Sequence, residues 1–238
     1  MRLIVGQYDP TKWTRTLPAS TARNPHQGDP RSASLLVAQG VLQALEEGRL
    51  SPGQRLVEAD MAIRFGVGRN AVREGLQRLA SEGVVEISRH KGAIIRELSP
   101  EQALMTLELT ELLIGLAART AAREIGAPGA ASAVEHALER LASALAADDR
   151  RAFLRARNGF FGALLTASRN HELQRVTPTV QLHVLRAQYH LSSAYTRLHE
   201  DLAAIGKAVL AGDAQGAEDL AHAHVRRIRE ALQREQDG

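Results

Sequence analysis

The sequence predicts a mostly α-helical protein in two parts: three short helices with a β-hairpin, followed by an all-α bundle of about six helices. Three observations support this fold class. Apolar residues recur at helical spacing through most of the 238 residues. Aromatic residues make up only 3% of the chain, whereas Ala, Leu and Arg are abundant, which suits packed helices. Two short β-branched runs stand close together between residues 84 and 96.

The composition excludes several classes of protein. The chain has no cysteine, which rules out disulfides, thiolate metal sites and cysteine nucleophiles. Its apolar stretches are shorter than the roughly 20 residues that cross a bilayer. The N-terminus reaches Asp9 and Pro10 before a signal-peptide core could form, so we expect a cytoplasmic protein without membrane contact. A net charge of +3 and a pI near 9.7 favour a polyanionic partner.

Residues 1–30 are expected to form a flexible N-terminal arm, because they contain four prolines and show no sustained periodicity. Tyr8 and Trp13 could dock on the body of the protein. Alternatively, the basic residues of the arm could contact DNA; these are Lys12, Arg15 and Arg23.

Residues 31–99 predict a small domain that begins with a helix from about Ser32 to Gly48. The apolar face expected for this helix consists of Leu35, Ala38, Leu42 and Leu45. A second, shorter helix follows at about residues 58–65, and its expected buried residues are Met61, Ala62 and Phe65.

The third helix follows Gly66-Val67-Gly68, with Gly68 expected as its N-cap. Its inward-facing residues are expected to be Val72, Leu76 and Leu79. Two short strands come next, at residues 84–87 and 93–96, and form a two-stranded hairpin with a basic, glycine-containing tip.

The third helix opens with a polar face of Arg69, Asn70 and Arg73. In a helix-turn-helix the second helix of the pair enters the major groove, where Arg can bind guanine and Asn can bind adenine. The free N–H groups of the helix N-terminus can also bind a phosphate. A second contact is expected from the hairpin tip, at His90, Lys91 and Gly92. The pattern therefore predicts a winged helix-turn-helix domain that binds double-stranded DNA.

This domain resembles the winged-helix signature of the GntR family along the run GRLSPGQRLVEADMAIRFGVGRNAVREGLQRLASEGVVEISRHKGAIIREL. The matching landmarks are Pro52-Gly53, Leu56, Glu58, Met61-Ala62, Val67, Arg69, Val72-Arg73-Glu74, Leu76, Leu79, Glu82-Gly83 and Gly92. The resemblance implies a homodimer on a short palindromic operator, with Arg69 and Arg73 on the recognition helix and Lys91-Gly92 at the wing tip.

Several positions depart from the pattern of that family. Gly68 stands at a usual Ser or Thr, Asn70 at a common Thr, and Ala71 at a frequent Pro. Ala59 stands where some FadR-like members have an additional DNA-contacting arginine. These departures affect the operator sequence rather than the fold.

Ser99-Pro100 opens the second domain, residues 100–238, because Pro is favoured at the first helical position. The expected helices span about residues 100–125, 130–147, 149–168, 171–193, 196–211 and 213–235. Their short connections predict an antiparallel bundle. Over about residues 101–235 the sequence resembles the helical effector domain of the FadR branch, called FCD. Its landmarks here are Phe161, Ala167-Ser168-Arg169-Asn170, Leu173, the 208–213 stretch and Ala217.

The resemblance places the metal ligands of many FCD domains, one Asp and three His, at Asn158, Gly162, Leu202 and His224. A common arginine position falls on Thr110. Only His224 is a typical ligand, so we expect no metal cofactor.

An effector pocket between the helices is still expected, with Asn158 and His224 among its residues. Arg186 and Tyr189 could add polar anchors from a helix rich in Leu and Val. Because Arg186 would pair with a carboxylate, the expected effector is a small molecule such as an organic or acyl acid.

Three other functions can be weighed against a DNA-binding repressor with an effector. The sequence does not favour an enzyme, because it contains no G-x-S-x-G, H-E-x-x-H or Walker sequence. Its carboxylate pairs are expected at helix ends, where capping or solvation explains them; these are Asp148-Asp149 and Glu200-Asp201. A winged helix that binds protein would carry apolar residues on its recognition face. A DNA-binding regulator without an effector, whose helical domain only dimerises, stays open.

Overall fold

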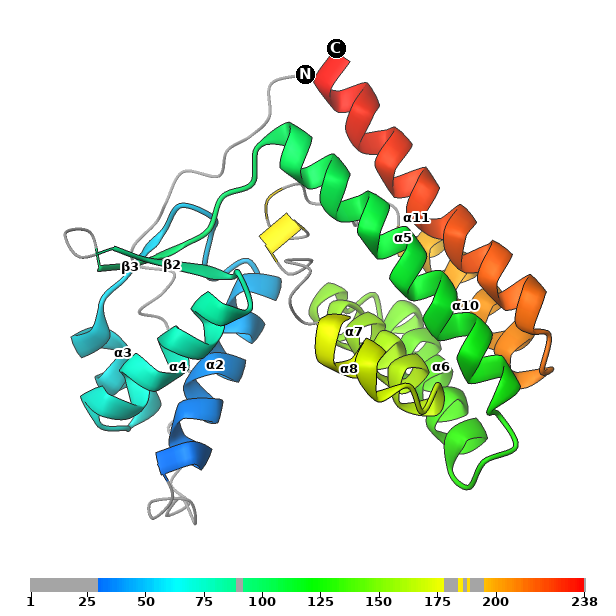
Figure 1. The fold of residues 1–238 in the computed structure, drawn as a ribbon, viewed down its shortest axis with the longest axis horizontal. Helices are drawn as coiled ribbons and strands as arrows, with labels where there is room; N and C mark the ends of the chain where they lie inside the picture. Colours follow the sequence, from blue (N-terminus) through cyan, green and yellow to red (C-terminus); the bar gives the residue numbers. More distant parts are fainter. Residues whose placement is uncertain (1–29, 89–91, 178–183, 186–187, 189–194, 238) are drawn as a thin grey trace. The chain divides into compact units, whose positions relative to one another are not determined.

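The computed structural model describes residues 30–88, 92–177, 184–185, 188 and 195–237, and it divides into two compact units. The first unit contains the described residues up to Leu98 together with Val184, Leu185 and Gln188. The second unit begins at Ser99 and contains the other described residues. The fold is mostly helical with one small sheet, which confirms the predicted fold class (Figure 1).

The first unit is built on three helices: α2 (Pro30–Glu46), α3 (Glu58–Phe65) and α4 (Arg69–Ser81). Its core includes the inward-facing residues predicted for α4, which are Val72, Leu76 and Leu79. Met61 of α3 is also buried as predicted. Ala62 and Phe65 are half-buried.

The buried face of α2 differs from the predicted one. Leu35 is exposed and Leu42 is only half-buried, although Ala38 and Leu45 are buried as expected. The remaining buried residues of this helix are Val37, Val41 and Ala44. Because α2 is apolar around most of its circumference, several stripes have helical spacing, and only the packing of the helix selects one of them.

The turn between α3 and α4 confirms Gly68 as the predicted N-cap of α4. Gly66 ends α3 in the left-handed conformation, with φ of 64°, which glycine adopts without steric cost. Gly68 is the extended N-cap of α4, and it has no side chain to cap the helix. The first turn of α4 therefore begins without a side-chain cap from Gly68.

α4 approaches α2 closely at Gly75. A Cβ atom at this position would lie 2.9 Å from the backbone oxygen of Ser34 and 2.9 Å from Cβ of Val37. Only a residue without a side chain permits this distance, so Gly75 sets how closely α4 packs on α2.

The sheet contains the predicted hairpin and one strand that the sequence analysis missed. Strands β2 (Val85–Ser88) and β3 (Gly92–Ile95) pair antiparallel, from Val85 opposite Ile95 to Ser88 opposite Gly92. The additional strand β1 (Arg55–Leu56) pairs with the other edge of β3. Two residues are too few to show the alternation that marks a strand.

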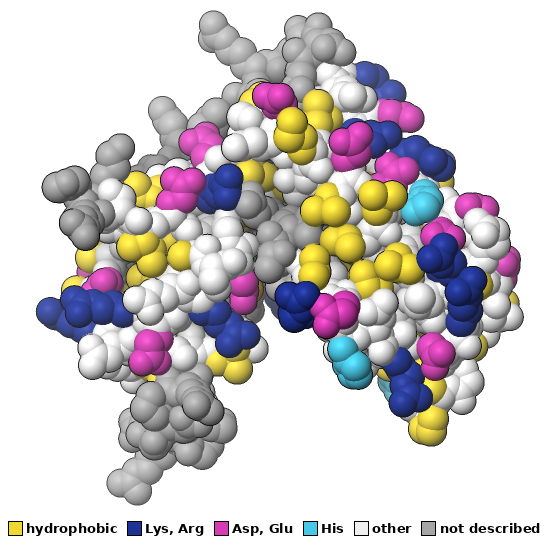
Figure 2. All heavy atoms as spheres, in the orientation of Figure 1, with side chains coloured by type: hydrophobic (Ala, Val, Ile, Leu, Met, Phe, Trp, Pro, Cys, Tyr) yellow, Lys and Arg dark blue, Asp and Glu magenta, His cyan; other side chains and the backbone are white. Residues whose placement is uncertain are grey.

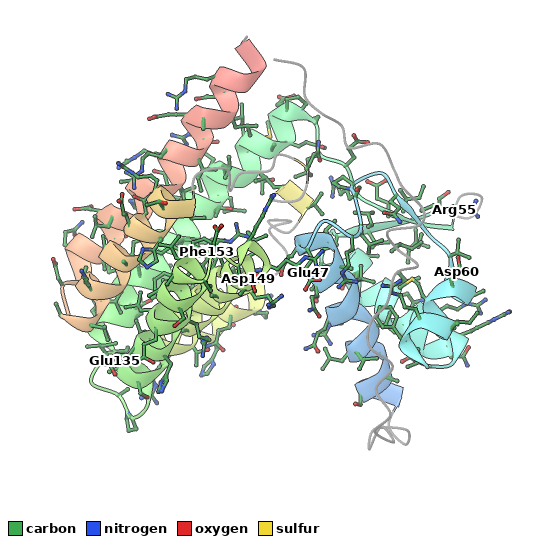
Figure 3. The ribbon with its side chains drawn as sticks, turned by 180° about the vertical axis from the view of Figure 1, so that it is seen from behind. Glu47, Arg55, Asp60, Glu135, Asp149 and Phe153 are labelled. Atoms are coloured by element: carbon green, nitrogen blue, oxygen red, sulfur yellow. The ribbon has the colours of Figure 1, made fainter. Side chains whose placement is uncertain are left out.

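The second unit contains six described helices: α5 (Pro100–Arg123), α6 (Ala130–Ala146), α7 (Arg150–Ala167), α8 (His171–Val176), α10 (Tyr195–Leu210) and α11 (Ala214–Asp237). Ser99 caps α5, since its side chain accepts a hydrogen bond from the backbone N–H of Gln102. Asp149, labelled in Figure 3, caps α7 in the same way through the N–H of Ala152.

The long helices α5 and α11 lie side by side, as do α6 and α7 (Figure 1). The core between these helices is made largely of Ala, Leu and Phe side chains, including Ala118, Ala121, Phe153, Phe160 and Leu202. None of the helices in the described part of the chain is long and apolar enough to span a membrane.

One predicted helix is wrong in its length. The sequence suggested a single helix over residues 171–193, but α8 ends at Val176 with Thr177 as its C-cap. Val184, Leu185 and Gln188 belong to the first unit instead. The apolar periodicity of the segment continues beyond α8, so it could not show that the chain changes its packing partners there.

Candidate nucleic-acid interface and polar cluster of the helical unit

The N-terminus of α4 presents three exposed polar side chains: Arg69, Asn70 and Arg73. They lie within the first five residues of the helix, as the sequence predicted. The dipole of α4 adds partial positive charge at this end, and the backbone N–H groups of its first turn have no hydrogen-bond partner within the helix. The arrangement can bind a phosphate and a base edge at the same time.

Arg73 is oriented by an acidic partner that sequence reasoning missed. Its Nε atom donates a hydrogen bond of 2.8 Å to Oε2 of Glu58, the first residue of α3. The Arg73 side chain is still 61% exposed, so the two terminal nitrogens of its guanidinium group can bind a base edge. Glu58 stands 15 residues earlier in the chain, and no local pattern indicates such a pair.

Strand β1 adds a further cation beside Gly92, at the tip end of the hairpin. Arg55 of β1, labelled in Figure 3, is exposed, and a Cβ atom at Gly92 would lie 3.8 Å from its Nε atom. Gly92 itself has φ of 73°. His90 and Lys91, the other predicted residues of the tip, lie outside the described residues.

The four positions that correspond to metal ligands in related domains have different environments. Leu202 is fully buried, Gly162 is exposed, and Asn158 is half-buried. His224 is buried, with 3% of its surface exposed. Within the described residues, no group of three or more His, Cys, Asp or Glu side chains is placed to hold a metal ion.

His224 belongs to a polar cluster with Asp201 and Arg227. Its Nδ1 atom lies 3.1 Å from Oδ2 of Asp201. Arg227 contacts both oxygens of the same carboxylate, with Nη2 at 2.5 Å from Oδ1 and Nε at 3.2 Å from Oδ2. Asp201 lies inside α10 with 12% of its side chain exposed, so the expectation that it is a solvated helix-end residue is wrong.

The cluster changes the acidity of Asp201. Burial alone would raise the pKa of its carboxyl group, but the hydrogen bonds and positive charges of His224 and Arg227 outweigh burial. The pKa of Asp201 therefore lies below its ordinary value. The carboxylate stays ionised at neutral pH and holds the two basic side chains together.

α7 carries a buried cation, Arg157, beside Asn158. Arg157 is only 5% exposed, and its Nη2 atom lies 3.5 Å from Oδ1 of Asn158. One turn further along α7, the ring of Phe161 lies 6.2 Å from the ring of His224, centre to centre. Asn158 therefore lies on α7 within one turn of Phe161, the residue of this helix that contacts His224.

Two predicted effector residues, Arg186 and Tyr189, lie outside the described residues. Sequence reasoning also missed Arg157, because it stands in an arginine-rich run with Arg151 and Arg155, both of which are exposed. A helical wheel centred on the buried Phe153, Phe160 and Leu164 would have placed Arg157 on the inner face.

Comparison with known families agrees with the two-part organisation. Residues 34–95 match the model of the bacterial regulatory proteins of the gntR family. Residues 105–227, about half of the chain, match the FCD domain. The chain belongs to the GntR family and carries an FCD domain. It is a DNA-binding transcriptional regulator and not an enzyme.

Curated relatives of this GntR regulator have similar length. An "Uncharacterized HTH-type transcriptional regulator" of Mycobacterium tuberculosis is 31% identical over 79% of this chain and 85% of its own length. The HTH-type transcriptional regulator LutR of Bacillus subtilis is 28% identical over 79% and 95%. A "Probable D-xylose utilization operon transcriptional repressor" of Paenarthrobacter nicotinovorans is 27% identical over 78% and 82%.

Solved structures share the fold of this regulator. Escherichia coli McbR/YncC superposes with a TM-score of 0.73 at 20% identity, covering 86% of this chain and 98% of that one. A GntR regulator from Rhodococcus superposes with a TM-score of 0.67 at 22% identity, covering 84% and 97%.

Proposed function

We propose that this GntR regulator is a homodimeric repressor of a short palindromic operator, released from DNA by a small organic or acyl acid. In this proposal residues 31–99 form the DNA-binding domain and residues 100–238 the effector and dimerisation domain. The observation that carries it is the exposed group of Arg69, Asn70 and Arg73 at the open N-terminus of α4.

Each side chain of this group has a chemical partner in the major groove. The arginines can bind O6 and N7 of guanine with two hydrogen bonds each, and Asn70 can bind N6 and N7 of adenine. The ion pair with Glu58 restricts the rotamers of Arg73, so less conformational entropy is lost on binding a base. Arg55, His90, Lys91 and Gly92 would contact the phosphate backbone and the minor groove beside the reading helix.

A homodimer would place two such helices on two half-sites, and their two-fold symmetry would make the operator palindromic. Occupation of an operator excludes polymerase, which supports repression as the outcome. One relative, from Paenarthrobacter nicotinovorans, is named as a repressor.

The effector site would lie in the helical domain near Asn158 and His224. The buried guanidinium group of Arg157 could bind a carboxylate there, and Phe161 offers an apolar surface next to His224. Arg186 and Tyr189 stay predicted members of this site. With Gly162 exposed and Leu202 apolar at two of the usual ligand positions, binding of the acid would depend on these side chains rather than on a metal.

In this proposal a segment within the sequence of the FCD match would couple the effector to DNA binding. Gln188 belongs to the first unit, where its amide binds both backbone groups of Leu98. The Leu98 N–H donates to Oε1 at 2.8 Å, and Nε2 donates to the Leu98 carbonyl at 2.7 Å. Val184 and Leu185 are fully buried nearby in sequence. Effector binding that displaces this segment would disturb the chain directly before Ser99, the N-cap of α5, and so shift the DNA-binding equilibrium.

Selection of bound sequences from random duplex DNA tests the proposal. Purified protein at near-physiological salt should enrich a short palindrome with guanine or adenine at equivalent positions of both halves. Enrichment of a single half-site would contradict the dimer, and enrichment of no sequence would contradict base reading by α4.

A further inference from the structure

The polar cluster of the helical domain contains a carboxylate that is largely removed from water. Asp201 lies inside α10 with 12% of its side chain exposed. The residues that follow Asp201 and His224 in the sequence, Leu202 and Val225, are both buried. An ionised carboxylate in such surroundings needs a positive charge and hydrogen-bond donors beside it. The group that supplies this positive charge therefore decides what the cluster requires from outside the chain.

Arg227 supplies the positive charge through a two-point contact. The Nε and Nη2 atoms of its guanidinium group contact one oxygen each of the Asp201 carboxylate. Such two-point pairing is the strong form of an arginine–carboxylate contact. His224 lies one turn before Arg227 on α11, and its Nδ1 atom lies 3.1 Å from Oδ2 of the same carboxylate. Both oxygens of Asp201 are thus in contact with side chains of α11.

The contact of Arg227 differs from those of its arginine neighbours on α11. Figure 2 shows Lys and Arg side chains beside Asp and Glu side chains on the surface over this helix. Arg226 and Arg229 contact Glu111 of α5 through their Nη1 atoms, at 3.6 Å and 3.3 Å. Arg227 contacts a carboxylate of α10 instead, and it shares that carboxylate with a buried histidine. General pairing of charges along α11 therefore does not account for this cluster.

The side chains of this chain do not fit a divalent metal at the position that corresponds to the metal site of related domains. Of the four residues that the resemblance aligns with metal ligands, Gly162 has no side chain, Leu202 is apolar and Asn158 offers a neutral amide. His224 is the remaining typical ligand, whereas zinc sites in proteins use three or four protein ligands. The carboxylate that contacts His224, Asp201, already has both oxygens in contact with α11.

We propose that the guanidinium group of Arg227 takes the place of the divalent cation of metal-binding FCD domains. Asp201, His224 and Arg227 then form an ionic centre that holds α10 on α11 without a metal. For the proposed effector function, on which this inference rests, an acid would bind to a domain whose cation is part of the chain. Without Arg227, Asp201 and His224 could share a metal ion. Their facing atoms are 3.1 Å apart, close to the separation of about 3.3 Å between two ligands of a tetrahedral zinc ion.

Thermal unfolding of the full-length protein, followed by circular dichroism, tests the proposal. The wild type should melt at the same temperature after EDTA treatment and after addition of Zn²⁺, because a ligand that does not bind the folded state cannot stabilise it. Arg227→Ala should melt several degrees lower and should regain a few degrees with Zn²⁺, which would bind between Asp201 and His224. Arg227→Lys keeps the positive charge, so it should melt closer to the wild type and should not respond to Zn²⁺. A wild type that loses stability in EDTA or gains stability with Zn²⁺ would overturn the proposal.

Two control variants separate a replaced cation from an ordinary structural ion pair. Arg226→Ala removes the neighbouring arginine, which lies 3.6 Å from Glu111, and should not respond to Zn²⁺. Arg227→Ala combined with His224→Gln lacks one of the two ligands and should lose the response to Zn²⁺.

The response to Zn²⁺ decides the outcome. The proposal is overturned if Arg227→Ala does not respond to Zn²⁺, if Arg227→Lys responds as strongly as Arg227→Ala, or if the double variant still responds. These measurements use neither DNA nor effector, so a failure here is distinct from a failure of the operator selection.

Discussion

Gly75 is the position at which a single methyl group should move the recognition helix. In Gly75→Ala the new Cβ atom would lie 2.9 Å from the Ser34 backbone oxygen and 2.9 Å from two carbons of Val37. Val37 is fully buried, and a backbone oxygen moves only with its helix, so α4 must shift away from α2 by several tenths of an ångström.

The energetic result is a balance of two terms. Overpacking of this kind costs about 1–3 kcal/mol, and two rigid contacts place it in the upper half of that range. Replacing Gly by Ala inside a helix contributes about 1 kcal/mol in the opposite direction. The net loss should be about 1 kcal/mol, which lowers the melting temperature of a domain of this size by roughly 4–8 °C.

Calorimetry of the full-length variant measures this loss, with Gly162→Ala as the matched control. Gly162 is also helical, but a Cβ atom there would meet nothing within 4 Å, so alanine should stabilise α7. The Gly75→Ala variant should also bind operator DNA more weakly, because α4 would be displaced from its native position relative to α2. A Gly75→Ala protein as stable as Gly162→Ala would refute the packing argument.

Three further perturbations test other parts of the molecule. Lys91→Ala at the predicted wing tip should weaken binding to all DNA sequences alike. It should also reduce the slope of log affinity against log salt concentration by about one phosphate contact, as measured by fluorescence anisotropy. A loss of affinity for only some sequences would argue against a phosphate contact. The pKa of Asp201 is lower in the folded protein than in the unfolded chain, so its ionised carboxylate stabilises the fold. This stabilisation is complete above the unfolded carboxyl pKa of about 4 and is lost as the pH falls through the lower pKa of the folded state. Asp201→Asn should therefore be less stable than the wild type at neutral pH, and the difference should shrink in acid; urea unfolding at several pH values that gave a constant difference would be inconsistent with this linkage. Gln188→Ala leaves two backbone groups of buried Leu98 without their partners, so it should destabilise the first unit by about 1–3 kcal/mol. If thermal unfolding shows no loss of stability, the Gln188 hydrogen bonds do not stabilise this unit.

Local sequence signals were sufficient for the elements that carry the DNA-binding face. Gly66 and Gly68 mark the turn before α4, and Ser99-Pro100 marks the start of α5, because caps depend on residues within one turn. The inner face of α4 followed from apolar spacing alone, since its outer face is strongly polar.

Features that depend on distant parts of the chain could not be predicted. The Glu58–Arg73 pair joins two helices, and the Asp201–His224 contact joins residues 23 positions apart. Arg157 is buried, but its sequence neighbours Arg151 and Arg155 are exposed, so the arginine-rich run does not distinguish it from surface residues. α8 ends at Val176 although the apolar pattern continues, and Val184, Leu185 and Gln188 belong to the other unit.

Reading of bases by α4 is tested most directly by repeating the DNA selection with Arg69→Ala. The account predicts that the variant enriches the same palindrome as the wild type but loses base preference at one equivalent position in each half-site, with a loss of about 1–3 kcal/mol there. An unchanged sequence preference at every position would contradict the assignment of α4 as the recognition helix.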